Sequence, residues 1–196
     1  MARVSSTGYL PLQVVGGYLA TRFGGKWILL VAVLLPSLFT MFTPLACSSL
    51  AVFIALRILT GLFESASFPA IFALCSQWAP KFERSLFIGI IDAGGYLGMA
   101  LTLPFTGWIC DAYGWRWAFY LYGVFGIVWA LAWWFWAASG PEDHVSITES
   151  EALYIVAHRA DLTISKQQAA GKVAIPWRAI ACHHVVWGLT VAHLRY

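Results

Sequence analysis

Charged side chains are scarce in this sequence. Lys, Arg, Asp and Glu make up 11% of its 196 residues, whereas about a quarter of an ordinary soluble domain is charged. Hydrophobic residues make up 60%, well above the 45–50% or so that is usual. This combination excludes most soluble domains and predicts an all-α protein that crosses the lipid bilayer several times.

Signals for three other classes of site are also missing. The net charge is only +3, and no stretch clusters basic and aromatic residues, so nucleic acid is not an expected partner. No nucleophile–base arrangement or phosphate-cradling loop is present, so neither an enzyme nor a cofactor is expected. The four cysteines form no C-x-x-C pair; Cys47 and Cys110 could pair, although free thiols are the favoured interpretation. Three histidines near the end lack a set of acidic partners and predict no metal site: His183, His184 and His193.

Five apolar stretches predict membrane-spanning helices, each of which needs about 20 mostly apolar residues. They cover residues 5–20, 27–45, 50–78, 85–109 and 116–138. Together they predict a partial helical bundle over residues 1–138. The start of the chain lacks the basic segment, apolar core and cleavage site of a signal peptide, so we expect a spanning helix cut short at its beginning.

The composition changes at residue 139. Residues 139–175 are polar, and Thr148 with Glu151 has the spacing of a helix capping box. This region is predicted to be a linker with a short surface helix from about Glu149 to Asp161. Residues 176–196 are apolar again and predict the start of a further spanning helix.

Basic residues gather on one side of the predicted bundle. Alternate turns and the linker carry Arg22, Lys26, Lys81, Arg84, Arg159, Lys166 and Lys172. The opposite turns offer only Arg116. Because Lys and Arg accumulate in cytoplasmic loops, the first set of turns and the linker are predicted to be cytoplasmic.

Two opposite charges lie inside the third apolar stretch. Arg57 and Glu64 are seven positions apart, which puts them on nearly one helix face, about 10 Å apart along the axis. A charge at the centre of a spanning helix costs about 2.5–3.5 kcal/mol on the insertion scale, so such residues usually face a polar cavity. We expect this face to line a solute pathway. The alternative is that Arg57 extends to the membrane surface and Glu64 only bonds a neighbouring helix.

Glycines and prolines are expected to shape these helices. Pro69 frees a backbone carbonyl and should bend its helix just beyond Glu64, either to form the pathway or simply for packing. Asp92 is a further acid inside an apolar stretch, and pairing with Lys81 or Arg84 is favoured over a role in transport. The residues predicted to allow close packing or bends are Gly61, Pro69, Gly94, Gly98 and Pro104.

Two stretches of the sequence follow known patterns: G-G-Y-L-A-T-R-F-G-G-K (16–26) and R-I-L-T-G-L-F-E-S-A-S-F-P-A (57–70). The first resembles the signature loop of the major facilitator superfamily. The second resembles the fourth helix of its organic-anion and phosphate transporter branch, which includes sodium–phosphate cotransporters, sialin and vesicular glutamate transporters. Further matches follow in the expected order: W-A-P-K-F-E-R-S, L-P-F-T-G-W, G-W-R-W-A-F-Y-L-Y-G, S-I-T-E-S-E and I-P-W-R-A-I. The chain departs from the pattern at Thr21, where an acidic residue is usual, and at Val145, where proline is common.

The resemblance implies a fold and a function. The fold is a major facilitator-type N-terminal bundle that lacks its first helix, followed by a cytoplasmic linker and the start of a seventh helix, in a family with about twelve spans. The function is secondary active transport of a carboxylate or phosphate by alternating access, coupled to H⁺ or Na⁺, in the plasma membrane or in a lysosomal or vesicular membrane. The second hypothesis is a truncated, non-transporting membrane protein that is a vestigial or regulatory partner of a full-length relative.

The resemblance also implies roles for individual residues. Arg57 is the expected anion ligand, because a guanidinium offers a planar fork to carboxylate or phosphate. Glu64 is the expected coupling residue, since desolvation favours its neutral form and lets it take up a proton. A loop that latches the two conformations is implied at Gly17, Arg22, Gly24 and Lys26. For the two basic residues of this loop, anchoring at the cytoplasmic surface is the alternative.

Overall fold

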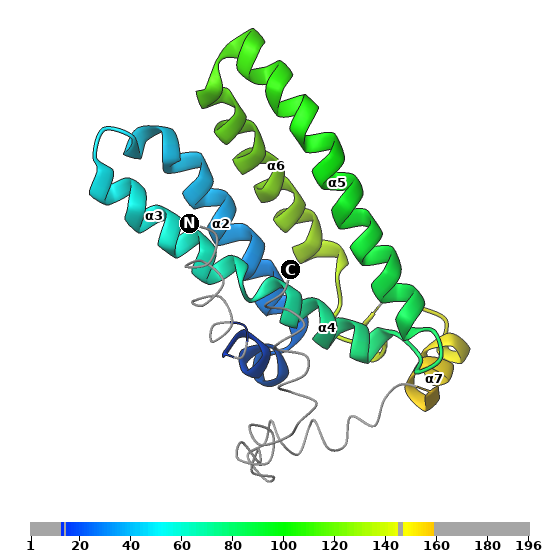
Figure 1. Ribbon diagram of the computed structural model, residues 1–196. Coiled ribbons are helices and arrows are strands. Elements are labelled where there is room, and N and C mark those ends of the chain that lie inside the picture. The colour runs from blue at the N-terminus through cyan, green and yellow to red at the C-terminus, as the bar shows by residue number, and fades with distance from the viewer. Residues whose placement is uncertain (1–12, 14, 145–146, 159–196) are drawn as a thin grey trace, which may run out of the picture. The chain divides into compact units, whose positions relative to one another are not determined.

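The computed structural model describes residues 13, 15–144 and 147–158. These residues form helices and one short 3-10 helix, with no strand among them, and this confirms the all-α fold class. The elements are α2 (Gly25–Ala46), α3 (Leu50–Glu64), α4 (Ser67–Trp78), α5 (Arg84–Tyr113), α6 (Trp115–Trp136), η1 (Pro141–Asp143) and α7 (Glu149–His158) (Figure 1). Residues 15–23 are helical as well.

Four segments in the described part of the chain are long and apolar enough to span a membrane. They are Gly25–Ala46, Leu50–Trp78, Arg84–Tyr113 and Trp115–Trp136. The expected first span, residues 5–20, lies mainly outside the described residues, as do the end of the linker and residues 176–196. The division of the chain at residues 138 and 175 therefore stays a prediction.

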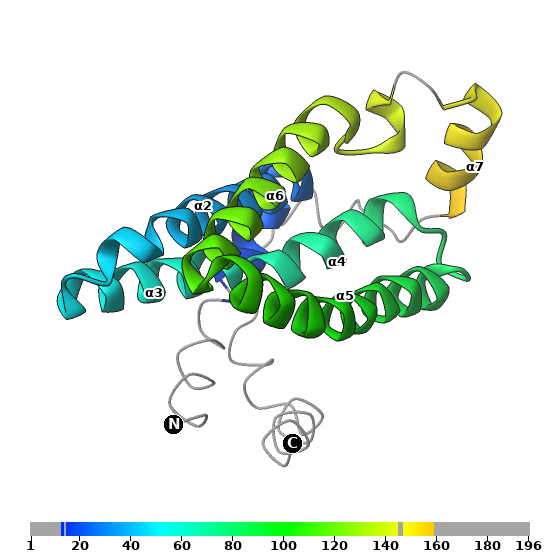
Figure 2. The ribbon, with the colours of Figure 1, turned by 90° about the horizontal axis from the view of Figure 1, so that it is seen from above.

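The segment expected to be one helix over residues 50–78 is two helices. Helix α3 ends at Glu64 and α4 begins at Ser67, and the two continue in nearly the same direction (Figure 2). Pro69 has no N–H for the carbonyl of Ser65, four residues earlier, and the helix is interrupted at that carbonyl. The Ala66 N–H donates instead to the carbonyl of Phe63 at 3.2 Å, the tighter pattern of a 3-10 turn.

The turn expected over residues 110–115 is much shorter. Helix α5 continues through Cys110 and Asp111 to Tyr113, and α6 begins at Trp115. Gly114 alone makes the turn, with φ 89°, a backbone conformation that glycine adopts without steric cost. One glycine is thus enough to reverse the chain at this end of the bundle.

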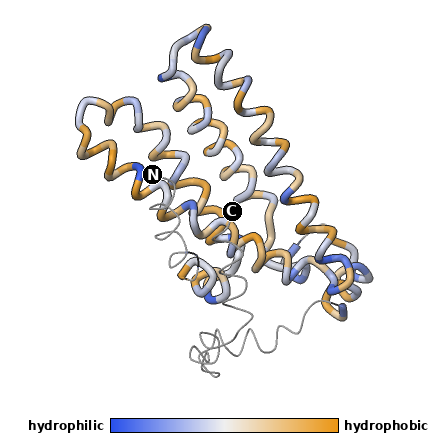
Figure 3. Tube along the Cα trace, viewed as in Figure 1, coloured by the Kyte–Doolittle hydropathy of each residue, from blue (hydrophilic) through white to orange (hydrophobic). Residues whose placement is uncertain are grey.

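Helix α2 is the centre of the described bundle, because it packs against α3, α4 and α6. Glycines allow its close approach to α6. A Cβ at Gly123 would lie 2.9 Å from the Cβ of Met41, and one at Gly126 would collide with Ser37. The Trp133 Nε1–H also donates to the carbonyl of Lys26 at 3.3 Å. The hydrophobic residues of these helices run along their whole length (Figure 3).

One end of the bundle gathers the basic turns and the start of the linker (Figure 1). The Lys81 N–H donates to the carbonyl of His158, the last residue of α7, at 3.0 Å. The ring of Trp78 meets the ring of His144 edge-on, with centroids 5.7 Å apart. Helix α7 therefore lies against the loop between α4 and α5, on the side where the sequence places the positive charge.

Candidate functional site

The two charges predicted to line a pathway both lie on α3. Arg57 is exposed, and so is Glu64, the last residue of the helix. Helix α3 is described in full, and none of its 15 residues is buried. The helix thus carries both charges on a surface that the described part of the bundle leaves open.

The guanidinium of Arg57 contacts two aromatic rings. Its central carbon lies 5.3 Å from the ring centroid of Phe53, one turn earlier on α3. It also lies 5.5 Å from the ring centroid of Phe119 on α6. Both distances fall within the roughly 6 Å range of a cation–π interaction. Neither ring was predicted from the sequence; the four-residue spacing could have indicated Phe53, whereas Phe119 comes from a distant part of the chain.

Gly61 lies between the two charges, one turn after Arg57 and three residues before Glu64. A Cβ at Gly61 would meet no atom within 4 Å. At Gly61 itself, a small side chain would therefore have open space among the described residues. Chemically, the arrangement offers guanidinium N–H donors for an anion and, about 10 Å away along the axis, a carboxyl group.

The chain before α2 packs against the interruption in this span. A Cβ at Gly16 would lie 2.9 Å from the Cα of Ala66. A Cβ at Gly17 would lie 3.7 Å from the Cβ of Pro69, an ordinary contact. The short segment between α3 and α4 is thus held from one side by residues 15–23.

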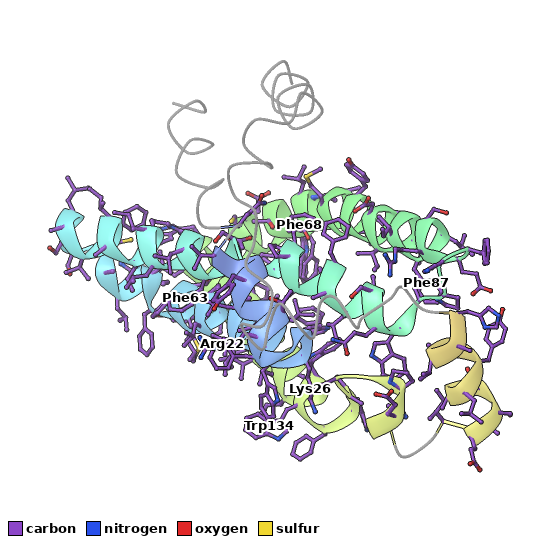
Figure 4. The ribbon with its side chains drawn as sticks, turned by 90° about the horizontal axis from the view of Figure 1, so that it is seen from below. Arg22, Lys26, Phe63, Phe68, Phe87 and Trp134 are labelled. Atoms are coloured by element: carbon purple, nitrogen blue, oxygen red, sulfur yellow. The ribbon has the colours of Figure 1, made fainter. Side chains whose placement is uncertain are left out.

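The other residues of the expected latch loop surround the start of α2 (Figure 4). Gly24 precedes the helix with φ 90°. The guanidinium carbon of Arg22 lies 5.7 Å from the ring centroid of Phe23, and the Nζ of Lys26 lies 5.4 Å from that of Trp27. Their role as a latch stays a prediction.

The residues singled out on α5 all lie on exposed parts of the helix: Asp92, Gly94, Gly98 and Pro104. A Cβ at Gly94 or Gly98 would meet nothing within 4 Å, so close packing there stays a prediction. Arg84, an expected partner of Asp92, instead donates through Nη2 to the carbonyl of Ser76 at 3.4 Å. Pro104 lies inside α5, which continues on both sides of it.

Metal-binding residues do not gather in the described part of the chain, where no group of three or more His, Cys, Asp or Glu could hold an ion. Cys47, Cys75 and Cys110 are free thiols. The three histidines considered in the sequence, His183, His184 and His193, lie outside the described residues.

Comparison with known proteins gives consistent matches. The Major Facilitator Superfamily model matches residues 1–194. Sialin from Ovis aries is 38% identical over 190 residues, and sialin from Homo sapiens is 37% identical over the same length; each match covers 96% of this chain and 37% of the relative. Vesicular glutamate transporter 2 from Mus musculus is 34% identical over 190 residues, which are 95% of this chain and 32% of that protein. The chain thus spans about a third of the length of these curated relatives.

Proposed function

Because the chain belongs to the major facilitator superfamily, we propose that the complete gene product is a secondary active transporter of an organic or inorganic anion. The solute is a carboxylate or a phosphate, moved by alternating access and coupled to H⁺ or Na⁺. The chain is a multi-pass membrane protein, as the four long apolar helices require. The relatives whose names state a solute are glutamate transporters.

One observation carries this proposal: α3 presents Arg57 on an open face of a membrane-spanning segment. A guanidinium in the hydrocarbon region is costly unless it faces a polar cavity or a partner. The Arg57 side chain contacts aromatic rings, which leave its net charge uncompensated. A mobile anion is the partner that suits such a cation, because a fixed carboxylate would compete with the solute.

The position of Glu64 supports the coupling part of the proposal. The residue ends α3, next to the interruption that Pro69 imposes. Discontinuous helices near the midplane are a common way for transporters to build binding sites. A carboxyl group at such a point can be hydrated in one conformation and occluded in the other, so that it exchanges its proton with one side at a time.

The basic residues on either side of Gly24, at the start of α2, have a separate part in the proposal. Arg22 and Lys26 flank Gly24 at the start of α2 (Figure 4). Together with Gly17 and Gly24 they are proposed to latch the two conformations at the cytoplasmic face. The alternative, that the two cations only anchor the loop at the membrane surface, predicts that neutral substitutions leave transport rates unchanged.

The test is uptake by the purified complete gene product in proteoliposomes with an imposed pH or Na⁺ gradient. Radiolabelled L-glutamate, N-acetylneuraminate and inorganic phosphate are the probes. We expect gradient-dependent accumulation of at least one of them. Failure of all three, with protein that is folded and inserted, would contradict anion transport and favour a non-transporting, regulatory membrane protein.

A further inference from the structure

We propose that Phe119 on α6 is a positioning residue for Arg57, which holds the guanidinium in place for the anion without neutralising it. This inference rests on the proposed function and extends it to a residue on a second helix. It follows from the contact between the ring of Phe119 and the guanidinium carbon, at 5.5 Å from the ring centroid.

Arg57 needs such support because its own helix gives it little. Helix α3 has no buried residue, and a long arginine side chain has many rotamers when nothing packs against it. Phe53 lies on the same helix and moves with Arg57. Phe119 is different, since it fixes the guanidinium relative to α6.

The ring of Phe119 is itself well anchored. It is half-buried, and the ring of Trp115, one turn earlier, meets it edge-on with centroids 5.9 Å apart. The adjacent Ala118 is buried, and Gly123, one turn later, lies directly against Met41 of α2. This part of α6 therefore has a fixed position in the bundle, and the ring of Phe119 restricts where the guanidinium of Arg57 can lie.

The chemistry of the contact suits an anion site. A phenyl ring attracts a cation to its face but accepts no conventional hydrogen bond, so the five N–H donors of the guanidinium stay available for a carboxylate or phosphate. A carboxylate in the place of Phe119 would hold Arg57 equally well but would occupy those donors. The aromatic contact thus orders the cation and preserves its charge.

The first experiment measures initial uptake rates in proteoliposomes for whichever of L-glutamate, N-acetylneuraminate and phosphate the wild type accumulates fastest. Phe119→Leu should raise KM about fivefold with little change in maximal rate, the effect expected from losing one cation–π contact. Phe119→Trp should restore a KM near the wild-type value, because indole is the stronger cation–π partner. The matched control is Phe125→Leu on the same helix, where the side chain is 71% exposed.

A second measurement separates positioning from simple packing. Replacing Phe119 with phenylalanines carrying one, two or three ring fluorines keeps the shape but weakens the attraction for a cation. KM should rise stepwise with each fluorine, because each one weakens the attraction of the ring for the guanidinium of Arg57.

The outcomes are distinct. If the wild type transports anions but KM is unchanged by Phe119→Leu and by fluorination, Phe119 does not position Arg57 and the inference is wrong while the proposed function stands. If Phe119→Leu raises KM and fluorination does not, the ring acts by packing alone and the inference is also wrong. If the wild type transports no anion, the proposed function is wrong, and the inference that rests on it is wrong as well.

Discussion

Two glycine-containing surfaces of this bundle are opposite in character. At the interface of α2 and α6, a Cβ at Gly123 or Gly126 would collide with Met41 or Ser37. On α3, a Cβ at Gly61 would meet nothing within 4 Å. In the sequence, all three glycines lie inside apolar stretches that predict helices. At Gly123 and Gly126 the missing side chain lets α2 and α6 approach closely. At Gly61 the missing side chain leaves open space between Arg57 and Glu64.

The largest effect is expected on the open surface. Arg57→Ala should lower anion uptake at least about a hundredfold, because several charge-assisted hydrogen bonds to the solute are lost. Arg57→Lys should recover only part of the rate, since an ammonium lacks the planar fork. Uptake in proteoliposomes, normalised to inserted protein, measures both.

Arg116→Ala is the matched control, because Arg116 also lies over an aromatic ring, that of Trp115 at 5.5 Å, but at the end of the bundle away from the linker. Its uptake should stay near that of the wild type. Normal uptake by Arg57→Ala would show that Arg57 is a structural residue and that the exposed face of α3 does not bind the anion.

At the interface of α2 and α6, substitutions should change the free energy of unfolding. Gly126→Ala is expected to destabilise the protein by about 1–3 kcal/mol, the usual cost of overpacking, because the new methyl group would overlap Ser37. Gly94→Ala on α5, where a Cβ has open space, should be neutral or slightly stabilising, since alanine favours helix. The midpoints of thermal unfolding of both variants, measured in the same detergent, test this difference. Equal midpoints would show that the α2–α6 contact is looser than described.

Gly61→Leu tests the open surface of α3 in the opposite way, by adding a side chain between Arg57 and Glu64. A Cβ at this position would meet no atom of the described bundle within 4 Å, so the unfolding midpoint should stay within the error of the wild type or rise slightly. Uptake should nevertheless fall severalfold, because the side chain enters the space between Arg57 and Glu64. A loss of stability without a loss of uptake would indicate that Gly61 packs against another helix, as the sequence alone suggested.

The smallest effect is expected at the edge of the packed surface. Trp133→Phe removes the hydrogen bond from Nε1 to the carbonyl of Lys26 and should cost about 0.5–1.5 kcal/mol. Trp136→Phe is the control, because Trp136 is 78% exposed. If the two variants unfold at the same temperature, the hydrogen bond contributes nothing measurable to the interface.

Much of the fold was predictable because it depends on local properties. Runs of about 20 apolar residues indicate spanning helices wherever they occur, and α2, α5 and α6 occupy such runs. The interruption after Glu64 was less obvious as a break in the helix, since the missing donor of Pro69 acts on a carbonyl four residues earlier. The turn between α5 and α6 was predicted over residues 110–115, but it is the single residue Gly114, because α5 continues through Cys110 and Asp111 to Tyr113.

Contacts between helices were not predictable in the same way. From the sequence, Gly61, Gly94 and Gly98 were expected to allow close packing, whereas the described close approaches involve Gly16, Gly25, Gly123 and Gly126. A glycine packs only if another helix lies opposite, and no local pattern contains that information. For the same reason, spacing on one helix predicted the shared face of Arg57 and Glu64 but could not indicate Phe119.

The central proposal is that one face of α3 binds an anion and couples its movement to H⁺ or Na⁺, and Glu64→Gln tests it most directly. Glutamine resembles the protonated acid and carries no charge, so anion exchange by counterflow should persist in proteoliposomes, whereas uphill accumulation driven by a pH or Na⁺ gradient should fail. Both rates are measured on the same preparation, which makes the counterflow signal the control for folding and binding. If Glu64→Gln accumulates the anion as well as the wild type does, Glu64 is not a coupling residue and the claim is wrong.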